Sequence, residues 1–243
     1  MTTIVISSII AGLATCLGSL IVIILGNPRE KTLSVLFGLA SGIMLAVVVL
    51  DLLPSALEES SFRHTAAGFS IGIIIMLALD LLLSQLYPPN HGKADPNSYF
   101  LKMGYLIAIG IALHDLPEGI AITAGYSAER NLGLVIALAI GLHNIPEGMA
   151  IATPLKIGGI SSAKILLINI VLSMFTPAGA FIGMILVNIS QRYNGLLLAI
   201  AAGAMSFIVQ NELLPESRRR HPNYSTMGGI LGFLFILGLT AVH

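Results

Sequence analysis

Two near-identical hexapeptides carry the side chains best suited to bind an ion. Residues 114–119 read HDLPEG and residues 143–148 read HNIPEG. On a helix, the His and the Glu of each hexapeptide stand four residues apart and project from the same face. Two such faces would combine two imidazoles with two carboxylates, a set that suits Zn²⁺, Fe²⁺ or Mn²⁺ better than Na⁺ or Ca²⁺. The pattern therefore predicts a divalent metal site with the ligands His114, Glu118, His143 and Glu147.

The residues beside these ligands extend the pattern. Asp115 and Asn144 stand three residues before the two glutamates, where they could form a second, adjacent site rich in oxygen atoms. Pro117 and Pro146 lack an amide hydrogen, so each is expected to kink its helix and to leave a backbone carbonyl free for an ion or water. One hexapeptide alone would be a weak signal, and its repetition makes the prediction specific.

The chain that must position these side chains is strongly apolar. Of its 243 residues, 56% are hydrophobic and 10% are charged, whereas soluble domains carry about 25% charged residues. Twelve Lys and Arg balance twelve Asp and Glu, so no charge excess points to nucleic acid. The single cysteine, Cys16, excludes an internal disulfide, and the start lacks the basic residues of a cleaved signal peptide. We therefore expect a single all-α integral membrane domain over residues 1–243, with no soluble domain.

The chain divides at its charged and proline-containing breaks into eight apolar segments, and about 20 apolar residues suffice to cross a bilayer. The fourth segment lies between Lys102 and Glu129 and the fifth between Arg130 and Lys156, so both hexapeptides fall near mid-membrane. Consecutive spans with a short connection are antiparallel neighbours, which lets the two motifs face each other at one depth. The expected spans are 3–25, 32–54, 66–87, 100–124, 131–153, 165–188, 193–214 and 225–242.

Basic residues are unevenly divided between the two ends of these spans. Nine fall on one side, and three, Arg63, Arg130 and Arg192, fall on the other. Short loops rich in Lys and Arg stay in the cytoplasm, so we expect both termini outside it. The longest connection, 88–99, would be a flexible cytoplasmic loop whose His91 could touch a passing metal ion, although a lone loop histidine is more often only solvated. The nine are Arg29, Lys31, Lys93, Lys102, Lys156, Lys164, Arg218, Arg219 and Arg220.

Apart from the loop charges, the charged residues within or at the ends of the spans are all acidic. They are Asp51, Asp80, Asp115, Glu118, Glu147 and Glu212. An ionised carboxylate at the bilayer centre costs about 3 kcal/mol, so we expect the compensating positive charge to come from outside the chain. The alternative is that each acid is protonated and hydrogen-bonded, which is plausible for Asp80 alone and poor for a cluster.

A fainter repeat links two spans that run in opposite directions. Residues 51–54 read DLLP in the second span, and residues 212–215 read ELLP in the seventh. Asp51 would lie roughly 10 Å outward of mid-membrane and Glu212 roughly 10 Å inward, at 1.5 Å per residue. Matching motifs in inverted halves are typical of transporters built from inverted repeats. The two acids are therefore candidate relay or gating residues, and the alternative is that each marks an acidic helix end followed by a proline stop.

At the two hexapeptides, and at the GMAIATPL run that follows at 148–155, the chain resembles the ZIP family of divalent metal transporters, in its ZupT/GufA-like bacterial branch. The resemblance extends over essentially the whole chain and includes the NELLP run at 211–215. It implies eight spans in the cell membrane, import toward the cytoplasm, an elevator-like or rocking movement between helix groups, and homodimers. The metal, with Zn²⁺ foremost, would be the substrate and not a cofactor, and no catalytic residue is implied. The implied ligands in spans four and five are His114, Glu118, His143 and Glu147, with Asp115 and Asn144 reaching a neighbouring second metal.

The chain departs from that family pattern at two positions. Thr176 in the sixth span stands where relatives often have Glu, and Asn211 in the seventh stands where they often have Asp. Ionised Asp115, Glu118 and Glu147 would carry three negative charges, so one divalent ion leaves one negative charge and two ions leave one positive charge. We therefore predict one well-occupied metal, with a second that is weak or transient. Asn211 similarly lowers the negative charge on the exit side.

Two other functions remain open on the residues alone. An intramembrane metal-dependent enzyme could use the same ions with Asp115 as its base, but no His-Glu-x-x-His motif occurs. A structural bundle with a static metal would leave Asp51 and Glu212 without a role. A transporter accounts for acids spread over the depth of the membrane. Its candidate pathway or gating residues are Asp51, Asp80, Thr176, Asn211 and Glu212.

Overall fold

The computed structural model describes residues 1–26, 29–86, 96–128, 130–186 and 191–240, and every regular element in that part of the chain is a helix. Two of the elements, η1 and η2, are short π-helical segments. In chain order they are α1 (Thr2–Leu25), α2 (Glu30–Val47), η1 (Val48–Leu52), α3 (Leu53–Glu59), α4 (Phe62–Leu86), α5 (Pro96–Ala128), α6 (Arg130–Ile157), α7 (Ser162–Leu172), α8 (Phe175–Leu186), α9 (Gln191–Ile208), η2 (Val209–Leu213), α10 (Leu214–Arg220) and α11 (Pro222–Thr240).

Within the described residues, seven helical runs are long and apolar enough to cross a membrane. They overlap the first seven expected spans, and their ends differ from the expected ends by up to six residues. The eighth expected span corresponds to α11, whose 19 residues extend over about 28 Å at 1.5 Å per residue. The seven runs are Thr2–Leu25, Glu30–Glu59, Phe62–Leu86, Asn97–Ser127, Gly133–Ile157, Ser162–Ile185 and Gly195–Arg220.

One helix begins at a proline, earlier than expected. α5 begins at Pro96 and not near residue 100, because proline fits the first turn of a helix, where an amide donor is not needed. The expected flexible connection over 88–99 is therefore partly wrong, since its last four residues are helical. Its remainder, with His91, lies outside the described residues, so the prediction for His91 stays untested.

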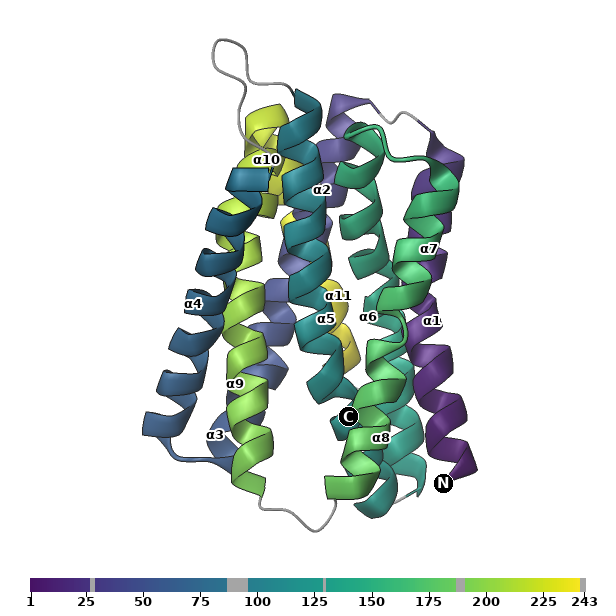
Figure 1. Ribbon diagram of the computed structural model, residues 1–243, viewed down its shortest axis with the longest axis vertical. Coiled ribbons are helices and arrows are strands. Elements are labelled where there is room, and N and C mark those ends of the chain that lie inside the picture. Colours follow the sequence, from purple (N-terminus) through teal and green to yellow (C-terminus); the bar gives the residue numbers. More distant parts are fainter. Residues whose placement is uncertain (27–28, 87–95, 129, 187–190, 241–243) are drawn as a thin grey trace.

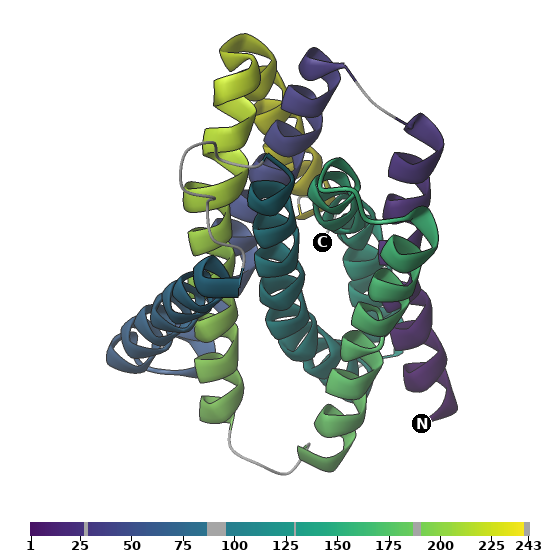
Figure 2. The same ribbon diagram turned by 45° about the horizontal axis from the view of Figure 1, so that its top comes forward.

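The helices form two bundles that lie side by side (Figure 1 and Figure 2). The first bundle comprises α1 and α5 through α8, in which α6 packs against α1 and α5, and α8 packs against α5. The second bundle comprises α2 through α4 and α9 through α11, in which α2 packs against α11, and α9 against α3 and α4. The bundles meet mainly where α5 contacts α9 and where α2 contacts α6. The two helices that carry the hexapeptides thus belong to one bundle and face the other.

Within each bundle, helices meet backbone to backbone at glycines. A methyl group added at Gly148 of α6 would collide with the carbonyl oxygen of Thr15 in α1. In the second bundle, a methyl group at Gly42 of α2 would collide with the backbone of Gly229 in α11. Small residues permit this close approach between membrane helices. Each bundle is therefore held internally by interlocked backbones.

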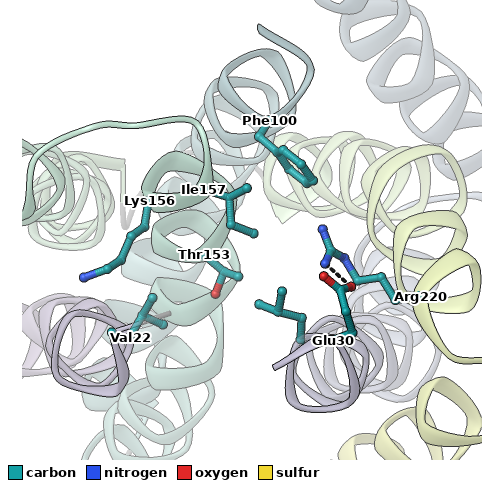
Figure 3. Close-up of a pocket in the computed structure, with 9 residues that line it drawn as sticks. Val22, Glu30, Phe100, Thr153, Lys156, Ile157 and Arg220 are labelled. Atoms are coloured by element: carbon teal, nitrogen blue, oxygen red, sulfur yellow. Dashed lines mark hydrogen bonds and ion pairs between the residues drawn. The ribbon is translucent and has the colours of Figure 1, made fainter. Parts of the chain in front are cut away.

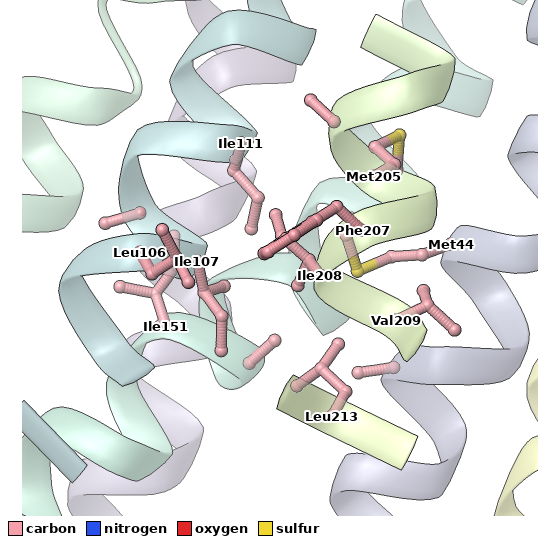
Figure 4. Packing of buried hydrophobic residues seen from close by; sticks show 14 of the residues in the cluster. Met44, Leu106, Ile107, Ile111, Ile151, Met205, Phe207, Ile208, Val209 and Leu213 are labelled. Atoms are coloured by element: carbon pink, nitrogen blue, oxygen red, sulfur yellow. The ribbon is translucent and has the colours of Figure 1, made fainter. Parts of the chain in front are cut away.

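Between the bundles, apolar side chains fill the interface. Figure 4 shows Ile107 and Ile111 of α5 directed toward Phe207 and Ile208 of α9. At Gly110 of α5, an added methyl group would first meet the side chain of Ile208 and not a backbone. Packed helices can slide by small amounts when side chains rearrange, so this interface is the more adaptable one.

The DLLP motif and the ELLP motif each lie at a π-helical segment. The amide of Leu53, at the end of η1, bonds to the carbonyl of Val48, and the amide of Leu214, at the end of η2, bonds to that of Val209. Both bonds reach one residue further back than in an α-helix. A proline follows each of these leucines, and its ring would clash with the carbonyl four residues earlier in a regular helix. The wider π turn relieves that clash at both places.

The single cysteine is buried in the first bundle. Cys16 lies on α1, carries a free thiol and is within hydrogen-bonding reach of Ser173, which joins α7 to α8. A buried thiol in apolar surroundings is shielded from reagents.

Candidate metal centre

Helices α5 and α6 run antiparallel and bring the two hexapeptides together. Both helices continue through their internal prolines, Pro117 in α5 and Pro146 in α6. Each helix turns its His and its Glu toward the other, as the four-residue spacing predicts. The first bundle therefore contains one buried centre formed by four side chains: His114, Glu118, His143 and Glu147.

Glu118 stands at the middle of this centre. Its Oε1 lies 2.8 Å from Nε2 of His114 and 2.5 Å from Nε2 of His143. Nε2 of His114 also lies 3.7 Å from Oε1 of Glu147. One ligand atom from each of His114, His143 and Glu147 lies within 4.8 Å of the other two, a grouping that could hold a metal ion. The four predicted ligands are thus brought together by the fold.

The centre is rich in buried oxygen atoms that lack hydrogen-bond partners within the described part of the chain. Both carboxylate oxygens of Glu147 and Oε2 of Glu118 are in this state. Buried polar atoms without partners are costly, because they lose hydration and gain nothing in return. A divalent cation would satisfy these oxygens and balance their charge. The donor set of two imidazole nitrogens and carboxylate oxygens fits a borderline divalent ion.

Asp115 and Asn144 are also buried, but neither belongs to the group of three that could hold the ion. Nδ2 of Asn144 donates a hydrogen bond to the carbonyl oxygen of Ala11 on α1, 3.0 Å away, and its Oδ1 has no partner among the residues that the structure describes. Both oxygens of Asp115 and the hydroxyl of Thr176 are likewise buried without partners in the described part of the chain. Helix α8 comes close at this point, because a methyl group at Gly119 would collide with the carbonyl of Thr176. Asp115, Asn144 and Thr176 therefore place additional oxygen atoms beside the centre.

The outlying acids have different surroundings. Asp51 accepts a 3.4 Å hydrogen bond from Ser55 and lies within electrostatic range of His143 and Glu118. Glu212 is buried in η2, and Lys102, Asp80 and Glu216 lie within electrostatic range of it.

Asp80 forms an ion pair within the chain. Its Oδ1 lies 2.6 Å from Nζ of Lys102, so the expectation that the positive charge compensating these acids comes only from outside the chain is wrong for this residue. Lys102 stands near the start of α5, and its long side chain reaches the acid on the neighbouring helix α4. Asn211, another candidate pathway residue, donates a 3.0 Å hydrogen bond from Nδ2 to the carbonyl oxygen of Phe207 within its own helical run.

Sequence reasoning missed Glu216. Its buried carboxylate accepts hydrogen bonds from Arg219 at 2.9 Å and from Arg220 at 2.7 Å, and Arg220 also pairs with Glu30 at the start of α2. The spacing of three and four residues from Glu216 to the two arginines was a signal for these contacts. Hydrogen bonds exchanged between Ser34 and Ser217 add to the junction of α2 with α10.

A cavity of about 390 Å³ lies between the bundles at their basic end (Figure 3). Figure 3 shows the ion pair of Glu30 and Arg220 on one side of it and Lys156 on the other. Thr153 in its wall stands six residues after Glu147 on α6, about 9 Å along the helix. The cavity is lined by Val22, Gly26, Glu30, Leu33, Phe100, Thr153, Lys156, Ile157 and Arg220.

Comparisons with known proteins agree with this chemistry. The sequence model of the family described as ZIP Zinc transporter matches residues 90–240. The zinc transporter ZupT of Lysinibacillus sphaericus is 32% identical over 97% of this chain and 95% of its own length. The zinc transporter ZupT of Akkermansia muciniphila is 35% identical over 93% of this chain and 92% of its own length. The zinc transporter ZupT of Salmonella arizonae is 30% identical over 97% of this chain and 94% of its own length.

Proposed function

The chain belongs to the ZIP zinc transporter family, and from that premise we propose that it carries Zn²⁺ across the cell membrane through the centre between α5 and α6. The observation that carries the proposal is the convergence of two histidines and two glutamates in one buried place. Other borderline divalent ions, Fe²⁺, Mn²⁺, Cd²⁺ and Co²⁺, have compatible ligand preferences. The metal is the substrate, and we assign no catalytic residue.

We assign the four converging side chains as the principal ligands. Neutral imidazoles supply nitrogen donors at His114 and His143, and Glu118 and Glu147 supply charged oxygens. A transporter must hold the ion well enough to replace its hydration shell and loosely enough to release it. Asp115 and the Oδ1 of Asn144 would serve a second, weaker metal position, because Thr176 contributes a neutral hydroxyl to that region.

We propose that the basic end of the molecule faces the cytoplasm and that transport runs toward it. Helix α5 begins, and helices α6 and α10 end, at the upper end in Figure 1. Near these helix ends stand Lys102, Lys156 and Arg218–Arg220. Short basic loops are retained in the cytoplasm. The N-terminus lies at the opposite end and would be extracytoplasmic. The cavity near Lys156 and Arg220 would then be the inner mouth of the route.

Asp51 and Glu212 are proposed as the outer and inner gating acids. Both lie in π-helical segments of the second bundle, and such segments often mark functional positions. Movement of the first bundle against the second would transfer the ion between them, because the interface between bundles is made of side chains and not of interlocked backbones. We also propose that two chains associate as a homodimer.

The test is uptake of Zn²⁺ and the other divalent ions into proteoliposomes across an imposed pH gradient. We expect His143→Ala and Glu118→Ala to abolish uptake of every ion, because each removes a ligand at the centre. Asp51→Asn and Glu212→Gln should each lower uptake severalfold. Glu58→Ala, which removes an exposed carboxylate, is the matched control. Full uptake by the two alanine variants would refute the centre, and unchanged uptake by the two gating variants would refute only the gates.

A further inference from the structure

The ion pair between Lys102 and Asp80 joins the two bundles at the basic end. Lys102 lies on α5 in the first bundle, and Asp80 lies on α4 in the second. Their Nζ and Oδ1 atoms are 2.6 Å apart, and each side chain is 22% exposed. The protein therefore does not fully enclose the pair, and surface ion pairs of this kind are weak enough to separate.

A second acid interacts electrostatically with the same ammonium. Glu212 of η2 lies within electrostatic range of both Lys102 and Asp80. Glu216 is also in range, but its carboxylate is held by Arg219 and Arg220. Arg220 in turn pairs with Glu30. In the described part of the chain, Lys102 thus pairs with Asp80 and also acts electrostatically on Glu212.

The charges of Lys102, Asp80 and Glu212 determine how strongly a metal ion would be held beside them. With Lys102 present, the group carries one negative charge, and a dication arriving there leaves one positive charge in excess. Without Lys102, two carboxylates would neutralise the dication completely and hold it. Charges near a protein surface interact by several kcal/mol at contact distances, so this difference changes the rate at which an ion departs.

We propose that Lys102 is a built-in competitor of the transported cation: its ammonium occupies Asp80 between transport events and displaces the metal ion from Asp80 and Glu212 during release. Lys102 stands twelve residues before His114 on α5, about 18 Å along the helix, so it acts on the departing ion and is not a ligand of the centre. This inference rests on the proposed function, because it concerns the release step of that transport.

The first test replaces the charge and keeps the length of the side chain. Lys102→Met should slow the release of ⁶⁵Zn²⁺ from loaded protein into excess chelator on the order of tenfold, because one more unit of negative charge acts on the ion. Maximal uptake into proteoliposomes should fall with it, whereas the apparent KM for external zinc should not rise. Lys102→Arg should release zinc like the unmodified chain. Lys164→Met, at an exposed lysine on α7, is the control and should change neither quantity.

The second test separates competition from a structural role. Adding Asp80→Asn to Lys102→Met returns the group to one negative charge, so the double variant should release zinc faster than the single variant. An ion pair that only stabilised the fold would give no such recovery. Release by Lys102→Met at the unmodified rate, or a double variant as slow as the single one, would overturn this inference while leaving the proposed function intact. Absence of zinc uptake by the unmodified chain would overturn both.

Discussion

Side chains at the centre differ in the number of partners that the fold already gives them. Glu118 contacts both histidines, whereas the oxygens of Glu147 and Asp115 are buried without hydrogen-bond partners among the described residues. Thr176 adds a hydroxyl that is also without a partner. A second dication beside the first would need more negative charge than this set supplies, since Thr176 is neutral.

Thr176→Glu should therefore raise the number of metal ions bound per chain from about one to about two, because it adds a carboxylate where the hydroxyl now stands. The measurement is the zinc content of purified protein after equilibrium dialysis at sub-micromolar free Zn²⁺. The glutamine of Thr176→Gln is close to glutamate in size but carries no charge, so this variant should still bind about one metal ion per chain. Two fully occupied zinc ions in the unmodified chain would contradict the charge argument.

For individual side chains, the sequence was sufficient to predict contacts within the repeated motif and insufficient to predict contacts between other helices. The four-residue spacing and the repetition predicted that His114, Glu118, His143 and Glu147 share one centre, and the structure brings them together. The pairing of Lys102 with Asp80 depends on how α4 and α5 lie against each other and on the reach of a long side chain. Neither quantity is encoded in residue spacing along one helix.

Helices in this molecule are joined by two kinds of contact. Within the bundles, glycines allow one backbone to touch the next, as Gly148 does with Thr15. Between the bundles, branched and sulfur-containing side chains meet, as shown in Figure 4. Backbone contacts tolerate almost no change of distance, whereas side chains can repack. Motion during transport is accordingly expected between the bundles and not within them.

A methyl group at Gly148 should separate α1 from α6 and destabilise the protein. Gly148→Ala places the methyl group against a backbone carbonyl that cannot move aside, and such overpacking costs about 1–3 kcal/mol. The midpoint of thermal unfolding in detergent should fall. Gly238→Ala is the matched control, because open space surrounds that position on α11. An equal midpoint in the two variants would mean that the α1–α6 contact is looser than the structure has it.

The positions of the helices followed from hydropathy, but their internal geometry did not. Apolar length predicted the described part of each span to within several residues. The π-helical segments η1 and η2 arise from a proline placed shortly after an acid, and a proline can equally end a helix, kink it or widen a turn. Only packing against the rest of the second bundle decides among these outcomes.

Considered as a whole, the molecule exposes much of its apolar surface. In α4, only 22% of the most apolar stretch is buried inside the chain, and Figure 2 shows this helix inclined away from its neighbours. Lipid or another protein must cover such a surface. The grouping of spans into two bundles was not predictable from the sequence, because the apolar character of a span carries little information about its partners.

We expect the protein in lipid nanodiscs to have the mass of two chains, each of 25.5 kDa. The physical reason is that association would cover apolar helix surface through close packing that lipid tails achieve less well. Native mass spectrometry measures this directly. A single-chain mass at concentrations that still support zinc transport would show that transport needs no second copy.

The burial of Cys16 makes this chain suited to spectroscopic distance measurements in its native sequence. The one sulfhydryl is enclosed between α1 and the α7–α8 junction, so a maleimide or nitroxide reagent would react with cysteines introduced elsewhere. Phe62 on α4 and Phe181 on α8 are exposed and belong to different bundles. Probes at those two positions would report the separation of the bundles with and without zinc, against a background free of competing label.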